Sequence, residues 1–327
     1  MKLLITLHHR FDLWNAPAWL AKRLRADFPQ LEVVQLPNYD RLTKEIADAE
    51  IYVGWSLRAE QLAAAKKLHW IHSTAAAVHQ LMIPELRVSS IVLTNARDVH
   101  GPVVAEHAIA LLMALAKRLP TAMRYQRQQV WAQEQMWRET PPPREVAGAK
   151  LLLLGLGSIG QRIAISAKAL GMHVIAVREH PEKGSGEAHE VHGMEKLDGL
   201  LGRADYVLIV APLTPATRDL FNAQRLAKMR NDAYLINVAR GPIVNEAALA
   251  RALQTKQIAG AALDVFAAEP LPDDSALWKL ENVLITPHTA AVTEKLWERH
   301  YVLLRENVQR YLVGRPLLNV VDKFKGY

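Results

Sequence analysis

The sequence predicts an α/β fold with two domains, each built on a doubly wound parallel sheet. Short apolar runs alternate with amphipathic stretches along most of the chain, the pattern of parallel strands joined by helices. A proline-rich stretch, ETPPPRE at residues 139–145, cannot continue a helix and separates two such series. The length, 327 residues, is enough for two hydrophobic cores.

The first series contains five short apolar runs, most of them followed by a stretch with helical periodicity. The expected strands are residues 3–7, 32–36, 51–55, 70–73 and 91–95. The expected helices are AWLAKRLRADF, RLTKEIADA and AEQLAAAKK. Alternation of strand and helix requires parallel pairing, with helices on both faces of the sheet.

A long helix is expected next, over residues 103–118. Its sequence includes AEHAIALLMALAKRL, which is apolar on most sides, so the helix is buried between domains or between subunits. The strands expected in the second series are residues 150–154, 173–177, 206–210, 234–238, 261–265 and 283–286. A final helical stretch, TEKLWERHYVLLRENVQRYLVG, follows them.

Composition narrows the function classes. Lys and Arg exceed Asp and Glu, 40 to 33, but the basic residues are scattered and no nucleic-acid-binding motif is present, so we expect no nucleic-acid partner. The chain has no cysteine, which excludes disulfides and thiolate catalysis, and we expect no metal site. No run approaches ~20 apolar residues and MKLLITLHHR is too short for a signal-peptide core. We therefore expect a cytoplasmic protein without membrane contact.

The motif GLGSIG follows the apolar run KLLLL and precedes a helix. Its glycines, Gly155, Gly157 and Gly160, permit a tight turn, close approach to a pyrophosphate and close packing of helix on strand. A second strand ~20 residues further on completes the context in which this motif binds a dinucleotide. We expect Ser158 and Ile159, between the glycines, to contact the cofactor as well.

The second strand of this series ends in VIAVREH, with Arg178 where an NAD-binding enzyme usually has Asp or Glu. A carboxylate accepts hydrogen bonds from the ribose hydroxyls, whereas a guanidinium pairs with a 2′-phosphate. His180 and Lys183 can add positive charge. In the alternative interpretation, Arg178 points into solvent and Glu179 holds the ribose. We expect NADPH to be preferred over NADH.

Three polar residues follow later strands of the same series: Arg240 in NVARGPIVNE, Glu269 in DVFAAEP and His288 in TPHTA. An open parallel sheet gathers its ligands at the carboxyl ends of its strands, so these side chains should meet. Arg240 can grip a carboxylate with two hydrogen bonds. His288 can protonate a carbonyl oxygen, while Glu269 fixes its tautomer. Beside a nicotinamide, these are the parts needed to reduce a 2-oxo acid.

Six segments together resemble the D-isomer-specific 2-hydroxyacid dehydrogenase family, and in particular its glyoxylate/hydroxypyruvate reductases. They are GLGSIG, PLTPATR, NVARGPIVNE, ALDVFAAEPLP, ITPHTA and NVQRYLVGRPLLNVV. The resemblance implies a flavodoxin-like substrate domain, residues 1–98 and 295–327, and a Rossmann dinucleotide-binding domain, residues 99–294. It also implies a homodimer, built in part by VVAEHAIALLMALAKRLP, and reduction of a small 2-oxo acid to the D-2-hydroxy acid with NAD(P)H.

The resemblance further assigns roles to single residues. Arg240 binds substrate, Glu269 and His288 transfer a proton, and Asp264 lies on the nicotinamide side. The other expected cofactor contacts are Pro212, Thr217, Val238, Ala239, Ala290 and His288 itself.

A glycine-rich loop of the family holds the substrate carboxylate with its backbone amides. The matching stretch here is STAAAVHQL, in which Ala75, Ala76 and Ala77 are the expected contacts. Ala75 and Ala77 replace usual glycines, and His79 replaces a usual Asp. These departures change the shape of the loop.

Two other classes of function occur on the same scaffold, a different dehydrogenase and a non-catalytic nucleotide-binding protein. A formate dehydrogenase would have Gln in place of Glu269, so the carboxylate argues against it, whereas a phosphite dehydrogenase uses a similar Arg, Glu and His set. A dinucleotide-sensing corepressor or scaffold would bind the nucleotide with slow or no turnover. The complete set of Arg240, Glu269 and His288 favours the reductase.

Overall fold

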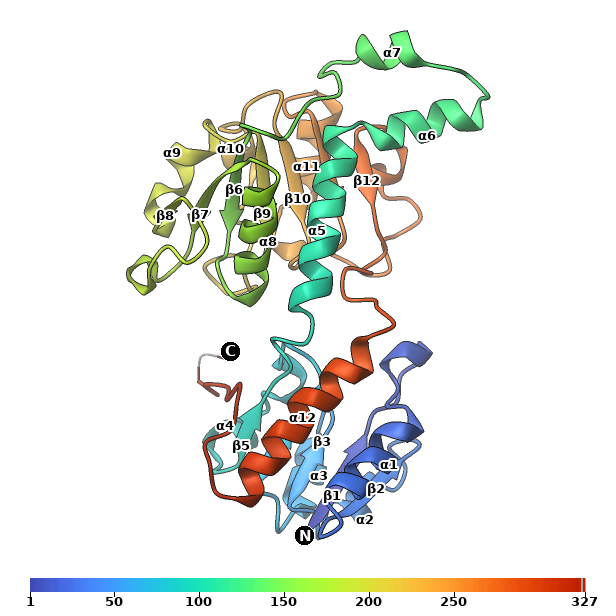
Figure 1. Cartoon of the computed structure of the whole chain (residues 1–327), viewed down its shortest axis with the longest axis vertical. Helices are drawn as coiled ribbons and strands as arrows, with labels where there is room; N and C mark the ends of the chain where they lie inside the picture. Colours follow the sequence, from blue (N-terminus) through green and yellow to red (C-terminus); the bar gives the residue numbers. More distant parts are fainter. Residues whose placement is uncertain (325, 327) are drawn as a thin grey trace. The chain divides into compact units, whose positions relative to one another are not determined.

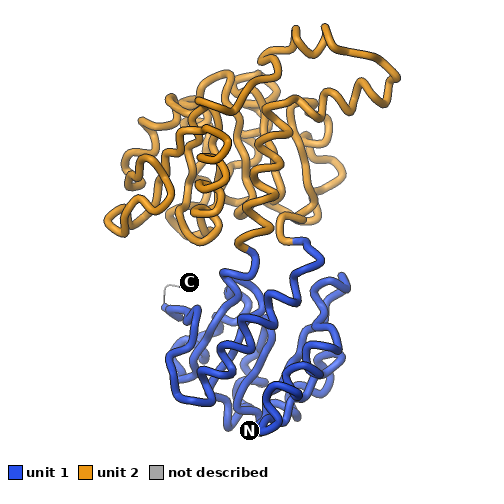
Figure 2. Tube along the Cα trace, in the orientation of Figure 1, with its two compact units in different colours: residues 1–100, 292–327 blue, residues 101–291 orange. Residues whose placement is uncertain are grey.

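The computed structural model describes residues 1–324 and residue 326, and the chain divides into two compact units (Figure 2). Unit 1 comprises residues 1–100 and 292–327, and unit 2 comprises residues 101–291. Each unit contains one all-parallel sheet with a hydrophobic cluster on each face. The predicted fold class, two parallel-sheet α/β domains, is confirmed.

Unit 1 has a five-stranded sheet with the strand order β2-β1-β3-β4-β5 (Figure 1). The strands are β1 (Lys2–Thr6), β2 (Glu32–Leu36), β3 (Ile51–Val53), β4 (Trp70–His72) and β5 (Val92–Thr94). The helices are α1 (Ala18–Asp27), α2 (Leu42–Glu45), α3 (Ala59–Ala64), α4 (Pro84–Val88) and α12 (Leu296–Leu312). The unit therefore combines strands from the beginning of the chain with a helix from its last part.

Both faces of the unit 1 sheet are covered. Leu3 and Ile5 of β1 pack with α1 and α12, whereas Leu4 packs with α2 and α4 on the opposite face. Successive side chains of a strand point to opposite faces, so a strand covered on both sides is a continuous apolar run. This is why KLLIT is recognisable as a buried strand from its sequence.

Unit 2 has a seven-stranded sheet with the order β12-β11-β10-β9-β6-β7-β8. Its strands are β6 (Lys150–Leu154), β7 (His173–Val177), β8 (Glu190–His192), β9 (Tyr206–Ile209), β10 (Tyr234–Asn237), β11 (Gly260–Leu263) and β12 (Val283–Ile285). Its helices are α5 (Gly101–Ala116), α6 (Leu119–Arg127), α7 (Gln133–Trp137), α8 (Ser158–Ala169), α9 (Leu197–Leu201), α10 (Ala223–Leu226) and α11 (Glu246–Gln254).

The strand order of unit 2 reverses beside β6. The chain runs from β6 outward to β7 and β8, then returns to β9 on the other side of β6. Helices α5 and α8 cover one face of this sheet, and α9, α10 and α11 cover the other (Figure 1). Such a reversal leaves a crevice at the carboxyl ends of the strands, where open α/β sheets bind ligands.

Several short elements are absent from the sequence-based prediction. Strand β8 reads Glu-Val-His, lies at the end of the strand order beside β7 and has no apolar run to mark it. The helix expected to reach residue 118 ends at Ala116, because Arg118 takes a left-handed backbone conformation (φ 56°) and is the N-cap of α6. No helix in the described part of the chain is long and apolar enough to cross a membrane.

Residues 119–143, including α6 and α7, form an arm that projects from the body of unit 2 (Figure 1). The arm leaves and returns at one point. The backbone amide of Arg144 donates to the Ala116 carbonyl (2.9 Å), and Lys117 Nζ donates to the Arg144 carbonyl (2.9 Å). The base of the arm is therefore closed by hydrogen bonds.

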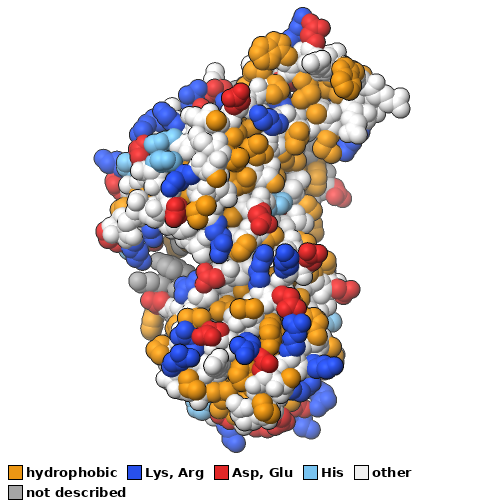
Figure 3. Space-filling view, viewed as in Figure 1, with side chains coloured by type: hydrophobic (Ala, Val, Ile, Leu, Met, Phe, Trp, Pro, Cys, Tyr) orange, Lys and Arg blue, Asp and Glu red, His pale blue; other side chains and the backbone are white. Residues whose placement is uncertain are grey.

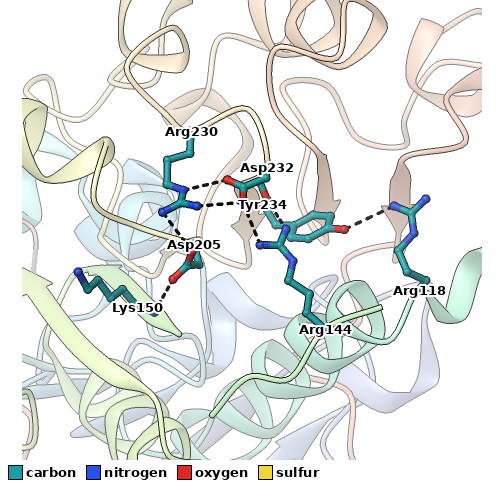
Figure 4. Close-up of polar contacts among 7 residues, drawn as sticks. All are labelled: Arg118, Arg144, Lys150, Asp205, Arg230, Asp232 and Tyr234. Atoms are coloured by element: carbon teal, nitrogen blue, oxygen red, sulfur yellow. Dashed lines mark hydrogen bonds and ion pairs between the residues drawn. The ribbon is translucent and has the colours of Figure 1, made fainter. Parts of the chain in front are cut away.

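Both ends of the arm are also tied to the amino ends of the central strands (Figure 4). The ring of Tyr234 stacks on the ring of Tyr206 at 5.7 Å. The Arg144 guanidinium lies 5.2 Å from the centre of the Tyr234 ring and pairs with Asp232, while Arg118 donates to the Tyr234 hydroxyl. The arm is thus anchored to the amino ends of the strands, whereas the crevice lies at their carboxyl ends.

Candidate active site

The turn after β6 is shaped by three glycines. Gly155 has φ +101°, and a Cβ there would lie 2.9 Å from the Ala211 amide nitrogen in the loop after β9. A Cβ on Gly160 would lie 2.3 Å from the Gly155 carbonyl oxygen, so helix α8 packs closely on the turn. A Cβ on Gly157 would meet nothing within 4 Å. The open side of the turn at Gly157, in front of the amino end of α8, fits a pyrophosphate.

Arg178 directly follows β7, and its backbone amide donates to the carbonyl of His192 in β8 (3.0 Å). Its half-buried side chain has no hydrogen-bond or ion-pair partner within the part of the chain that the structure describes. His180, in contrast, pairs with Glu182 (3.1 Å), and Lys183 is exposed. Arg178 is therefore a cation directly at this strand end whose guanidinium is available to a ligand phosphate.

The loop after β9 holds Pro212 and Thr217. The Thr217 hydroxyl donates to the Pro212 carbonyl (2.8 Å) and accepts from the Thr214 amide (2.7 Å). Since the side chain is buried and its bonding capacity is used within the loop, Thr217 shapes this loop. A direct bond from its hydroxyl to a phosphate would break these contacts.

Arg240 is positioned by Asn237, the last residue of β10. The Asn237 amide nitrogen donates to the Arg240 carbonyl (3.0 Å), and its oxygen accepts from the Ala239 amide (3.0 Å). Gly241 follows, and a Cβ there would lie 1.9 Å from the Phe266 carbonyl group in the loop after β11. The two loops therefore touch, which brings Arg240 near the loop that carries Glu269.

Glu269 and His288 form a direct pair. His288 Nδ1 lies 2.6 Å from Glu269 Oε2, while Glu269 Oε1 accepts from the Phe266 amide (2.9 Å). A carboxylate bonded to Nδ1 orients the ring and leaves Nε2 for another partner. His288 has a left-handed backbone conformation (φ 52°), and its amide donates to the Asp264 carbonyl (2.9 Å). The ring is half exposed.

The electrostatics of the pair favour a protonated imidazole. The hydrogen bond that His288 donates to Glu269 raises the pKa of His288, and this outweighs the effect of burial and of Arg240. Burial opposes ionisation of Glu269, but its bonds to His288 and the Phe266 amide lower its pKa nevertheless. Burial lowers the pKa of Arg240, with Glu269 acting in the opposite direction, and a guanidinium remains charged at neutral pH.

Asp264 lies at the end of β11 with its carboxylate fully buried. It accepts hydrogen bonds from the Thr286 hydroxyl (2.6 Å) and from the amides of Thr289 (2.8 Å) and Ala290 (3.0 Å). Burial alone would raise the pKa of Asp264, but these bonds and one from His107 outweigh it and lower the pKa. The ionised carboxylate therefore organises the loop that carries His288.

The other predicted cofactor contacts also lie at this edge of unit 2. Val238 and Ala239 follow β10 directly and are buried, as is Ala290 in the loop after β12. Ser158 is exposed and Ile159 is half buried at the start of α8.

The predicted substrate loop belongs to unit 1, where it follows β4. The Ala75 amide is not free to bind a ligand, because it donates to Ser73 Oγ (3.2 Å). The carbonyl of Ala75 accepts from the Ala96 amide, and the carbonyl of Ala76 accepts from the Asn95 side chain. The backbone amides of Ala76 and Ala77 have no hydrogen-bond acceptor among residues 1–324 and 326. These two half-buried amides are therefore available to an anion.

Three residues that shape the site were not singled out from the sequence. Asn237 lies in the motif NVARG and Thr286 in the motif TPHTA, so their position next to Arg240 and His288 in the sequence is the signal that could identify them. His107 stands in an apolar helix, far from the motifs in sequence, and its contact with Thr286 (3.1 Å) is visible only in the structure.

Comparison with known proteins identifies the family. The model of the D-isomer specific 2-hydroxyacid dehydrogenase NAD binding domain matches residues 109–290. The D-3-phosphoglycerate dehydrogenase of Methanocaldococcus jannaschii is 31% identical over 92% of this chain and 57% of its own length. The chain thus spans about half the length of the phosphoglycerate dehydrogenases it matches. The glyoxylate reductase of Korarchaeum cryptofilum is 32% identical over 97% of this chain and 90% of its own.

A solved structure agrees along the whole chain. The D-isomer specific 2-hydroxyacid dehydrogenase of Xanthobacter autotrophicus Py2, in complex with NADPH and MES, is 31% identical with a TM-score of 0.84. The match covers 100% of this chain and 99% of the other. Motifs, fold and site residues point to the same group of oxidoreductases. The chain belongs to the D-isomer specific 2-hydroxyacid dehydrogenase family.

Proposed function

We propose that this chain is an NAD(P)H-dependent reductase that converts a small 2-oxo acid into the D-2-hydroxy acid. The observation that carries the proposal is the pair of Glu269 and His288, 2.6 Å apart, at the carboxyl edge of a sheet that also holds a dinucleotide turn and Arg240. A protonated imidazole with one free nitrogen is the acid that carbonyl reduction requires.

Each residue has a distinct task in this reaction. Arg240 holds the substrate carboxylate with two parallel hydrogen bonds and fixes the adjacent carbonyl. When bound, NAD(P)H supplies a hydride to the carbonyl carbon. His288 donates its Nε2 proton to the carbonyl oxygen as negative charge develops there, and Glu269 stabilises the imidazolium beforehand through Nδ1. In the direction of oxidation, neutral His288 accepts the hydroxyl proton.

Two regions would hold the ligands. The glycine turn with Gly157 and the amino end of α8 fit the cofactor's pyrophosphate. In unit 1, the amides of Ala76 and Ala77 suit a substrate carboxylate, since they have no other acceptor within the described chain. The roles of unit 2 as the nucleotide domain and unit 1 as the substrate domain rest on these two features.

We further propose that NADPH is preferred over NADH. Arg178 replaces the carboxylate that would bind the ribose hydroxyls of NADH, and its guanidinium has no other partner in the described structure. A charge-assisted hydrogen bond contributes about 1.5–3 kcal/mol, which corresponds to roughly ten- to a hundred-fold in kcat/KM. The Xanthobacter relative was solved in complex with NADPH, so a protein 31% identical to this chain binds that cofactor.

A homodimer is the assembly that we propose. Exposed apolar side chains gather on the arm (Figure 3), and they are Leu119, Met123, Val130, Trp131 and Trp137. Trp131 is 90% exposed and Trp137 is 72% exposed. A patch of this kind on a projecting segment marks a protein-protein interface, and two arms related by two-fold symmetry could cover one another's apolar side chains.

The test is a steady-state assay with a panel of 2-oxo acids, glyoxylate included, each with NADPH and with NADH. D-3-phosphoglycerate is assayed in the oxidative direction, and the configuration of the product is determined by chiral chromatography. We expect turnover of at least one 2-oxo acid to the D product. His288→Ala should lower kcat ~10²- to 10⁴-fold, the usual contribution of a positioned general acid.

The controls separate the competing functions. Arg240→Ala should mainly raise KM, since its task is to bind and orient the substrate. Tight nucleotide binding without turnover of any compound would support the corepressor instead. Normal turnover in His288→Ala would contradict the proposed role of this residue.

A further inference from the structure

The loop that carries His288 is folded around one buried group. The Asp264 carboxylate binds the hydroxyl of Thr286 and the amides of Thr289 and Ala290, the residues that flank His288. The His288 amide itself donates to the Asp264 carbonyl. The loop is thus held from both sides, and its shape sets the position of the His288 ring.

His107 reaches this arrangement from helix α5. Its Nε2 lies 3.1 Å from Thr286 Oγ1 and 3.5 Å from Asp264 Oδ1. The ionised Asp264 cannot donate, so the single hydroxyl proton of Thr286 goes to the carboxylate. The Thr286 oxygen can therefore only accept from His107, which fixes the proton on Nε2. The chain of donors runs from His107 to Thr286 to Asp264.

We propose that His107 is a positioning residue for His288, acting through Thr286 and Asp264. His107 links a helix on the face of the sheet to the loop that carries the acid. This inference rests on the proposed function, in which His288 is that acid. His107, Thr286 and Asp264 do not touch the substrate in this proposal, whereas His288 does. His107 instead fixes where the imidazole stands relative to Glu269.

A positioning role for His107 predicts a change in the pKa of His288, which an ordinary structural contact would not cause. The groups that face His288 are Glu269, Asp264 and Arg240. If the loop relaxes, the hydrogen bond from His288 to Glu269 lengthens and the pKa of His288 falls, because that bond is the main cause of its rise. A contact that only stabilised α5 would change the unfolding temperature and leave the pH profile in place.

The experiment compares His107→Leu with His107→Gln in the full-length chain. Leu removes the donor, whereas the Gln amide nitrogen can reach the position of Nε2. We expect His107→Leu to lower kcat about 10- to 100-fold, the scale expected when a reacting group is misplaced. KM for the 2-oxo acid should change little. His107→Gln should recover most of the activity.

A second pair tests the same chain of donors at its next member. Thr286→Val removes the hydroxyl and should reproduce His107→Leu, while Thr286→Ser keeps it and should resemble the wild type. The pKa of His288 is followed in each variant without ligand by NMR of its imidazole. It should fall in His107→Leu and Thr286→Val and stay in place in the two conservative variants.

The outcomes separate this inference from the proposed function. If the wild type reduces a 2-oxo acid and His288→Ala does not, the proposed function stands. A His107→Leu enzyme with wild-type kcat and an unchanged or raised His288 pKa would then overturn the role of His107 alone. Equal losses of kcat in His107→Leu and His107→Gln would also overturn this role, because restoring a hydrogen-bond donor at position 107 would then not restore activity.

Discussion

Glu269 determines at which pH His288 carries a proton. Its carboxylate raises the pKa of His288 in the folded enzyme, so the acid form persists to higher pH. In Glu269→Gln the charge is gone while the burial of His288 remains, and its pKa should fall. Reduction should therefore decline at lower pH than in the wild type, as measured by kcat/KM across the pH range.

A suitable control is Glu246→Gln. Glu246 bonds the Ala267 amide (3.1 Å) in the same region but does not contact His288. Its variant should keep the wild-type profile. Coincident profiles for the wild type and Glu269→Gln would contradict the assigned pairing.

The proposed preference for NADPH rests on Arg178. Arg178→Asp replaces the cation with a group that binds ribose hydroxyls and repels a 2′-phosphate. We expect the preference to reverse from NADPH to NADH, chiefly through a higher KM for NADPH. The measurement is the ratio of kcat/KM for the two cofactors.

Lys168→Asp makes the same charge change at the far end of α8 and should leave that ratio nearly unchanged. If the wild type has equal kcat/KM values for NADPH and NADH, or a higher value for NADH, Arg178 points into solvent and Glu179 or the backbone holds the ribose.

The edge of the unit 1 sheet makes this unit sensitive to acid. His72, at the end of β4, is 1% exposed and bonds Thr94 in β5 (2.8 Å), and burial lowers its pKa to about 4. Burial, with His100 and His72 nearby, also lowers the pKa of His300. Between pH ~6.5 and ~4 these histidines bind protons in the unfolded chain but stay neutral in the folded one. The free energy of unfolding therefore falls as the pH falls.

We expect His72 to contribute on the order of 3 kcal/mol to this loss. His72→Asn keeps a nitrogen for Thr94 but does not titrate, so its urea-induced unfolding should depend less on pH in this window. His69→Asn, at an exposed position three residues earlier and directly before β4, should retain the full dependence. Equal slopes in wild type and His72→Asn would refute the assignment.

Long buried strands were predictable from the sequence, and short or exposed elements were not. Strands β6 and β7 are continuous apolar runs with the predicted bounds, because burial on both faces leaves little choice of residue type. Strand β8 and the arm helices have no such signature. Within the site, the strand ends that hold Arg240 and His288 could be located, but the contact of His107 depends on how α5 packs, which no local pattern encodes.

At the scale of the whole molecule, the arm offers the clearest test of assembly. We expect the wild type to have twice the mass of one 36.6 kDa chain by light scattering. Trp131→Glu combined with Trp137→Glu places charges in the apolar patch and should yield monomers. The matched control is Trp278→Glu, since Trp278 is 50% exposed but lies outside the arm. A monomeric wild type, or a dimeric double variant, would contradict assembly through the arm.

The way unit 1 is divided along the chain has a consequence for its synthesis. Leu296, Trp297 and Leu304 of α12 belong to the same cluster as Leu3 and Ile5 of β1, so one face of the sheet is completed by residues synthesised after the whole of unit 2. All of unit 2 is synthesised in between. At about 5–20 residues per second, the nascent sheet waits roughly 10 to 40 s with part of that face uncovered. Unit 2 can complete its core first, and the waiting sheet is the part of the newborn chain that a chaperone would shield.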